Sequence, residues 1–245
     1  MKRIIFEVVF LLLMTRLLCQ EKVSYSFQIT PIISKSFLNS NKDSVIHLIS
    51  SKDYIHNRYN LDIPLVGYKI SLNINYKLNY RIEIYSGLNY THQRITHSFV
   101  FPIAKYIVVD GQSYTVTGFY GTFYSSYHYI SIPIGVQMNI LKINKNSLSI
   151  GNSYSIDYLV GSKDIKPILS TPTYYERYFE AKNFCLAGNL GIQYEFLYNE
   201  SVSLYIRPNF NLNLTPNLVD RDAINQFNYY IGIDFGIRFH LQKKV

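Results

Sequence analysis

The chain has no tryptophan and only two cysteines. Cys19 falls within the N-terminal leader, so the mature chain keeps the single thiol of Cys185 and can form no intramolecular disulfide. After the leader, no apolar run reaches the roughly 18 residues that a transmembrane helix requires. A chain of this kind that crosses a membrane must therefore cross it with strands.

Motifs that carry chemistry are also scarce. The histidines have no metal-ligand spacing, no cysteine pair supports zinc, and no glycine-rich loop could hold a phosphate. His97 next to Ser98, and His128 three residues before Ser131, come nearest to a nucleophile–base pair, but residues i and i+3 of a strand point to opposite faces. We therefore predict no catalytic, cofactor-binding or metal site. A lipid-modifying barrel enzyme, a lipid A hydrolase or acyltransferase, is the alternative. The six histidines are His47, His56, His92, His97, His128 and His240.

The charge is basic, with 24 Lys and Arg against 16 Asp and Glu. These residues are scattered through strands and loops, and the chain has neither a basic helix nor an aromatic RNA-binding motif, which argues against nucleic acid as a partner. Such charge suits contact with outer-membrane lipid, lipopolysaccharide or surface polysaccharide.

Residues 1–20 have the pattern of a secretory signal peptide. Two basic residues precede a mostly apolar stretch, Ile4–Leu18, and polar residues follow from Gln20. Two charges interrupt the apolar stretch, which disfavours a retained transmembrane helix. We predict cleavage near Cys19 or Gln20 and a mature domain of residues 21–245. The Leu-Leu-Cys sequence ending at Cys19 also resembles a lipidation site, which is the alternative for this segment.

The feature that is abundant is alternation: eight times an apolar residue alternates with a small or polar one for about ten residues. The connections between these runs are alternately short and long, which predicts an all-β, eight-stranded, antiparallel up-and-down transmembrane β-barrel with short periplasmic turns and four longer outer loops. Tyr (24) and Phe (15) residues near the strand ends fit interfacial girdles. The predicted strands are 23–30, 67–76, 81–90, 130–139, 148–158, 184–196, 202–212 and 229–241, and the predicted long loops are about 35–63, 92–126, 161–181 and 214–227.

Alternation alone also fits a soluble lipocalin-like barrel with its faces reversed. The composition of the polar face favours the transmembrane barrel, because this face consists mostly of Gly, Ser, Asn and Gln, which suit a crowded interior. Pro133 and Pro208 interrupt predicted strands, and we expect a local bulge at each.

Eight strands enclose a lumen that side chains can fill, so we predict a plugged barrel and not a diffusive pore. Charges of both signs should face this lumen and must pair or stay hydrated. Asp234 and Arg207 fall at similar depth on neighbouring strands. We interpret the network as a structural brace, with a proton-coupled gate as the alternative. The predicted network is Lys69, Arg81, Glu83, Asp157, Glu195, Arg207, Asp234 and Arg238.

Three segments carry a resemblance to a known family. The sequence Tyr129–Gly135 is similar to the aromatic and Ile-Pro strand entry of the PorT-like outer-membrane β-barrel family of Bacteroidetes, and Leu148–Val160 follows as its glycine-containing strand. The terminal Tyr230–Phe239 resembles the last strand of that family. The resemblance implies an outer-membrane location and insertion by the barrel assembly machinery. In the family the last aromatic residue usually ends the chain, whereas here six residues follow Phe239.

The four long loops are the remaining candidate binding regions, because proteins commonly carry their binding residues on loops held by a rigid scaffold. Aromatic and basic loops of this kind suit a surface protein or glycan partner. Solvated loops without a dedicated ligand are equally compatible with the sequence. We therefore predict a non-enzymatic outer-membrane protein with a structural, adhesive or interaction role. A lipid-modifying enzyme and an accessory component of protein secretion are the alternatives.

Overall fold

A computed structural model of the chain describes residues 22–40, 45–46, 49–50, 63–101, 105–109, 112–116, 119–165, 179–220 and 224–241. The predicted signal peptide lies outside these ranges. Among the described residues, no helix is long and apolar enough to cross a membrane.

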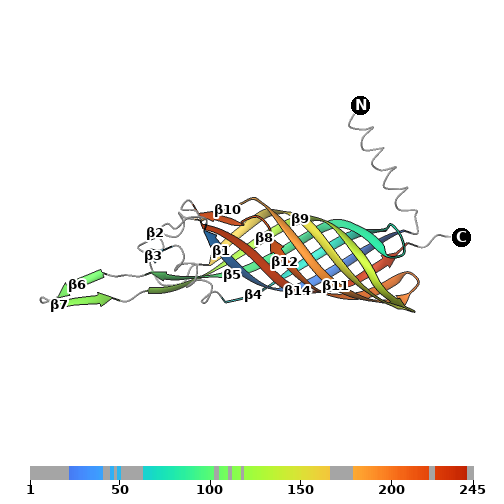
Figure 1. Cartoon of the computed structure of the whole chain (residues 1–245), viewed down its shortest axis with the longest axis horizontal. Helices are drawn as coiled ribbons and strands as arrows, with labels where there is room; N and C mark the ends of the chain where they lie inside the picture. The colour runs from blue at the N-terminus through green and yellow to red at the C-terminus, as the bar shows by residue number, and fades with distance from the viewer. Residues whose placement is uncertain are drawn as a thin grey trace, which may run out of the picture.

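Eight long strands form the wall of a closed barrel (Figure 1). Each pairs antiparallel with the next along the chain, and the first pairs with the last, which closes the sheet. The fold prediction is therefore confirmed. The strands are β1 (Val23–Ser40), β4 (Leu65–Lys77), β5 (Ile82–Phe101), β8 (Phe119–Ile143), β9 (Asn146–Ile165), β11 (Phe184–Asn199), β12 (Val202–Asn213) and β14 (Ile224–His240).

Short strands lie in the connections at one end of the barrel. β2 (Val45–Ile46) pairs with β3 (Ile49–Ser50), and β6 (Lys105–Val109) pairs with β7 (Gln112–Val116). β13 (Leu218–Asp220) pairs with β14 and with β10 (Phe179–Ala181), which extends the wall locally. We call this end the long-loop end.

The opposite end, here the short-turn end, holds three tight connections and both ends of the barrel sheet. Val23 and His240 begin and end the sheet there. In the turn between β8 and β9, Asn144 has a φ of 50°, a left-handed conformation that asparagine tolerates better than most residues. This arrangement agrees with the predicted order of short and long connections.

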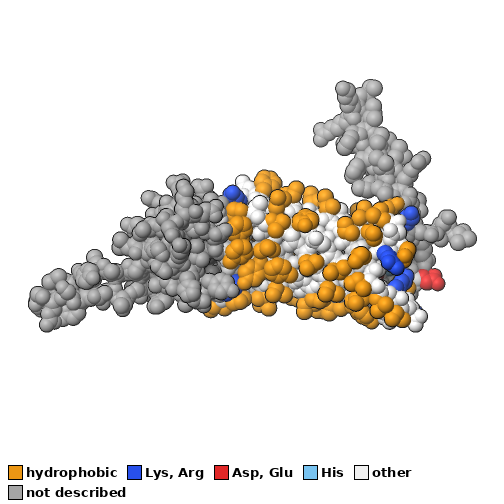
Figure 2. All heavy atoms as spheres, viewed as in Figure 1, with side chains coloured by type: hydrophobic (Ala, Val, Ile, Leu, Met, Phe, Trp, Pro, Cys, Tyr) orange, Lys and Arg blue, Asp and Glu red, His pale blue; other side chains and the backbone are white. Residues whose placement is uncertain are grey.

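Alternating side chains give the wall an apolar outside and a polar inside. β4 and β12 show the rule, since exposed and buried positions alternate along nearly their whole length. On the face drawn in Figure 2, hydrophobic side chains are spread over the wall between its two ends, with backbone and small polar side chains among them, and Lys and Arg lie toward those ends. A soluble protein would have the opposite polarity, so this surface is built for lipid.

At the long-loop end the strands are longer than predicted. The first predicted strand ended at residue 30, whereas β1 continues to Ser40. The predicted loop 92–126 is partly strand, because β5 continues to Phe101 and β8 begins at Phe119. Above the membrane a strand no longer needs an apolar outer face, so the period-two signal disappears although the backbone stays paired.

The predicted bulges at Pro133 and Pro208 are wrong. Pairing on both sides of each proline resumes in the same register, and the shifts lie elsewhere, between His128 and Tyr129, Asn139 and Leu141, and Leu197 and Asn199. Each proline opens one ladder without adding a residue. At Pro133, the Ser86 hydroxyl donates to the proline carbonyl at 2.8 Å and replaces a ladder bond.

Two inward-facing tyrosines lie flat over glycines of the neighbouring strand. Tyr205 pairs with Gly236, and Tyr85 pairs with Gly135. A Cβ on either glycine would overlap the tyrosine ring. The glycines therefore make room for aromatic rings that fill the narrow lumen.

We predict that Gly236→Ala lowers the free energy of unfolding by about 1–3 kcal/mol, because the new methyl group overpacks the Tyr205 ring. Urea unfolding of the detergent-refolded barrel, followed by gel mobility, measures the change. Gly151→Ala is the matched control, since the nearest atom to its Cβ would be 3.7 Å away. Equal losses for the two variants would contradict the proposed tyrosine packing.

Candidate functional site

Seven of the eight predicted interior charges face the lumen. Arg81 does not: it is exposed in the turn before β5, with its guanidinium 5.1 Å from the centre of the Tyr80 ring. The prediction failed there because the alternation was continued one residue beyond the start of the strand. The seven are Lys69, Glu83, Asp157, Glu195, Arg207, Asp234 and Arg238.

Asp234 is the centre of the mid-lumen cluster and is fully buried. Its Oδ2 lies 2.6 Å from Arg207 Nε, and its Oδ1 lies 3.5 Å from Lys69 Nζ. Thr30 and Asn209 also donate to Oδ1, at 2.5 and 2.9 Å. Arg207 and Asp234 are direct register partners, so the predicted proximity is confirmed. One carboxylate thus ties four consecutive strands of the wall together, β4, β1, β14 and β12.

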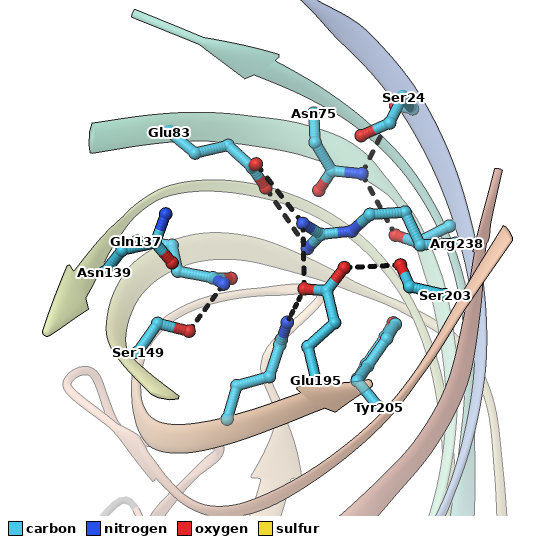
Figure 3. Close-up of polar contacts among 12 residues, drawn as sticks. Ser24, Asn75, Glu83, Gln137, Asn139, Ser149, Glu195, Ser203, Tyr205 and Arg238 are labelled. Carbon is cyan, nitrogen blue, oxygen red and sulfur yellow. Dashed lines mark hydrogen bonds and ion pairs between the residues drawn. The ribbon is translucent and has the colours of Figure 1, made fainter. Parts of the chain in front are cut away.

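A second cluster lies nearer the short-turn end (Figure 3). Arg238 of β14 reaches Glu83 of β5 at 3.1 Å and Glu195 of β11 at 3.2 Å. Ser203 donates to Glu195, and its hydroxyl is 2.8 Å from His240 Nε2. β14 is therefore joined by buried ion pairs to two strands with which it does not pair, which is how a stable interior holds charge.

Little space remains within the lumen. Around Lys69 and Asp157 there is an interior cavity of about 30 Å³, room for an isolated water but not for a continuous channel. Toward the long-loop end, Ile95, Tyr127 and Tyr129 pack into an apolar layer. At the short-turn end the lumen widens into a vestibule of about 590 Å³, which Glu195, Arg238 and other charged and polar residues line. Side chains thus fill most of the space around Lys69 and Asp157 in the described part of the barrel.

A different cluster lies on the outside of the wall, just beyond the apolar band at the long-loop end. The rings of His92 and His128 stack with centroids 4.6 Å apart and planes 10° apart. His92 Nε2 is 2.8 Å from Ser126 Oγ, and His128 Nε2 is 3.4 Å from it. Tyr90 Oη lies 2.7 Å from His128 Nδ1, and the exposed Tyr68 ring meets His92 edge-on. We call these five residues the outer-wall cluster.

Sequence reasoning missed this cluster. His128 and Ser131 face opposite sides of the wall, as predicted, but Ser126 lies two residues before His128 on the same face. That Ser-x-His spacing was the available signal, whereas His92 arrives from a neighbouring strand. The side chains of His97 and Ser98 lie outside the described residues. No group of three potential metal ligands occurs among the side chains that the structure describes.

A closed wall of eight strands, apolar outside and cross-braced by polar side chains inside, defines the class: a transmembrane β-barrel. The chain is similar in fold to Neisserial surface protein A, with 12% identity, coverage of 89% of this chain and 97% of that one, and a TM-score of 0.41. It is also similar to the outer membrane protease OmpT from Escherichia coli, with 10% identity, coverage of 89% of this chain and 96% of that one, and a TM-score of 0.44. The third similar structure is the outer membrane protein OprG from Pseudomonas aeruginosa, with 9% identity, coverage of 90% of this chain and 97% of that one, and a TM-score of 0.44.

The sequence matches no family model and no curated protein. The structural likenesses are too distant to assign an activity to this chain.

We predict that Asp234→Asn lowers the free energy of unfolding by about 3–5 kcal/mol, because Arg207 and Lys69 lose their shared buried counter-ion. Urea unfolding in lipid bilayers measures the loss. Asp157→Asn is the matched control. Its half-buried carboxylate accepts a hydrogen bond from Ser155 at 2.7 Å, and we expect a loss of about 1 kcal/mol. If both variants lost the same amount, Asp234 would not be the central brace.

Proposed function

We propose that the protein is a non-enzymatic outer-membrane barrel whose braced wall presents the β5–β8 hairpin and the other long connections to a surface protein or glycan. One observation carries the proposal: β5 and β8 remain paired far beyond the apolar band. Tyr90 and Ile130, which face each other, are the last outward apolar residues before His92 and His128, but pairing continues to Phe101 and Phe119.

The length of this extension favours a role outside the membrane. Phe101 lies eleven residue steps beyond Tyr90, and at about 3.3 Å per step they extend about 36 Å along the strand. The short strands β6 and β7 pair still farther from the barrel (Figure 1). A projecting paired ribbon can hold contact residues at a distance from the lipid surface better than an unpaired loop can.

The proposed location is the bacterial outer membrane. An even number of strands, short turns beside both ends of the barrel sheet and longer connections at the other end are the pattern of barrels in that membrane. The proposal includes export by a cleaved signal peptide and insertion by the barrel assembly machinery. Membership of the PorT-like family of Bacteroidetes is a narrower hypothesis that rests on the strand segments of β8, β9 and β14 alone.

A second candidate function has one observation in its favour. In the outer-wall cluster, Ser126 Oγ lies within hydrogen-bond reach of two imidazoles, and the Tyr90 hydroxyl holds one of them. A serine beside a histidine at the lipid boundary could attack an acyl ester: the histidine takes the hydroxyl proton, the acyl group moves to the serine, and the ester C–O bond breaks to release the alcohol, which receives that proton. Water would then hydrolyse the acyl-serine. Within the described residues, the group that orients His128 is a phenol and not a carboxylate, so the non-enzymatic role is the better supported.

Shortening the hairpin tests the main proposal. Phe101 and Phe119 are register partners, so an Asn-Gly turn can replace residues 102–118 without changing the barrel. Cells that display the shortened barrel should bind arrays of neutral and sulfated glycans at least about tenfold less than cells with the full chain. Replacing Glu200-Ser201 by Asn-Gly at the short-turn end is the control and should change nothing. Undiminished binding by the shortened barrel would refute the hairpin's role.

Lipid analysis tests the second candidate. We expect the lipid A mass spectrum of cells expressing Ser126→Ala or His128→Ala to equal that of cells expressing the unaltered chain, because no acyl chain is removed. Heat-dependent gel mobility shows that each variant is folded. If lipid A kept an extra acyl chain in the cells of the two variants but not in cells with the unaltered chain, the protein would be a hydrolase, since removal of a serine nucleophile typically lowers the rate by more than about a thousandfold.

A further inference from the structure

The outer-wall cluster lies at the height of lipid headgroups. On β8, six outward side chains from Ile130 to Ile140 are apolar and exposed. At about 3.3 Å per residue and a tilt near 40°, they span about 25 Å, the full height of a lipid-facing band. The next outward side chains toward the long-loop end are His128 and Ser126. They therefore face the polar boundary of the outer leaflet.

A register shift between β8 and β9 places a lysine beside the outward-facing residue Ser126. Between β8 and β9, Tyr129 pairs with Leu159, whereas His128 pairs with Gly161, so Val160 has no partner on β8. This added residue is a β-bulge, and it exchanges the inner and outer faces of β9 above it.

Because of the shift, Lys163 pairs with Ser126 on the outer face, and Ser126 pairs with Arg94 on its other side. Without the shift, Lys163 would pair with Ser125 in the inward-facing row. Arg94 and Lys163 thus flank Ser126, two strand spacings apart, with about 10 Å between their Cα atoms. Their long side chains can converge on one ligand between them.

The two cations have no acidic partner among the residues that the structure describes. Lys163 is exposed, Arg94 is half-buried, and neither forms an ion pair within the described part of the chain. Elsewhere in the described barrel the pattern differs, because Lys69, Arg207 and Arg238 each contact a carboxylate. An anion from outside the chain would complete the row.

Apolar surface lies directly below the cations. The next outward row toward the membrane centre contains Tyr90, Ile130, Tyr158 and Phe184, which are consecutive register partners. Tyr158 and Phe184 contact each other with ring centroids 4.9 Å apart. A ligand with a phosphate beside the two cations and acyl chains along the apolar row fits this arrangement, whereas a free inorganic anion would contact only the cations.

We propose that this part of the outer wall binds the phosphate of a phosphorylated glycolipid in the outer leaflet. The binding residues are Arg94, Ser126 and Lys163, together with the stacked His92 of β5 and His128 of β8. Arg94 can donate two parallel hydrogen bonds to phosphate oxygens, and Lys163 supplies a point charge. The imidazoles and the Ser126 hydroxyl give further polar contacts to the headgroup. Its acyl chains lie along the aromatic row. This site does not depend on the β5–β8 hairpin beyond residue 101.

The test uses the full barrel in phosphatidylcholine nanodiscs, titrated with bis-phosphorylated lipid A or the same lipid A after phosphatase treatment, with retention measured by native mass spectrometry. We expect the unaltered barrel to bind the phosphorylated form about tenfold more tightly. Arg94→Gln/Lys163→Gln should remove that preference. Lys142→Gln/Lys145→Gln makes the same charge change at the short-turn end and should keep it.

Each other outcome overturns the proposal. Equal binding of the two lipids by the unaltered barrel would exclude a phosphate site, and equal loss in both double variants would reduce the effect to net charge. If inorganic phosphate displaced lipid A at equal concentration, the ligand would be a free anion. Heat-dependent mobility identifies a variant that fails to fold, in which case the single variant Lys163→Gln is measured. The barrel with residues 102–118 replaced should keep the lipid preference, so this proposal and the hairpin proposal can fail separately.

Discussion

Closure of the hydrogen-bond ladder between β1 and β14 is the constraint on which the rest of the structure depends. Lipid offers no partner for a free N–H or C=O, so a sheet can cross a membrane only if its first and last strands pair. The pairing runs from Ser24 and His240 to Ser40 and Ile224, the full length of the wall. Eight strands then fix a narrow lumen, and the narrow lumen determines which side chains can face inward.

The interior must satisfy charge and volume together. Arg207 and Arg238 lie near the faces of Tyr85 and Tyr205, with 5.9 and 5.8 Å from each guanidinium carbon to the ring centre. Asp234 pairs with Arg207 on the adjacent strand, whereas Glu83 pairs with Arg238 of a strand that is not its neighbour. Rings over glycines fill the space while the ion pairs connect distant strands. A rigid wall of this kind can support extended strands well outside the lipid.

Much of the architecture follows from local pattern, and the rest depends on register. Period-two alternation was enough to predict eight strands, their order and the inward side, and similar depth was enough to pair Arg207 with Asp234. The upper ends of β5 and β8 escaped prediction because alternation is lost where both faces are wet. Of the outer-wall cluster, His92 could not be foreseen next to Ser126, because barrel shear sets which rows meet and a single sequence does not reveal it. Pro133 misled because a ladder can lose one donor without gaining a residue.

The bulge at Val160 has a consequence for how related sequences should be compared. Below it, even-numbered residues of β9 lie on the outer face; above it, Gly161 and Lys163 pair with the outward residues His128 and Ser126, so odd-numbered residues lie on the outer face. A homologue that lacked one residue here would keep the same upper sequence but present the opposite half of it to the membrane. Residues of β9 after position 160 can therefore be compared between homologues only when the number of residues at the bulge is the same. Insertion or deletion of one residue at this point would change the outer surface more than most substitutions could.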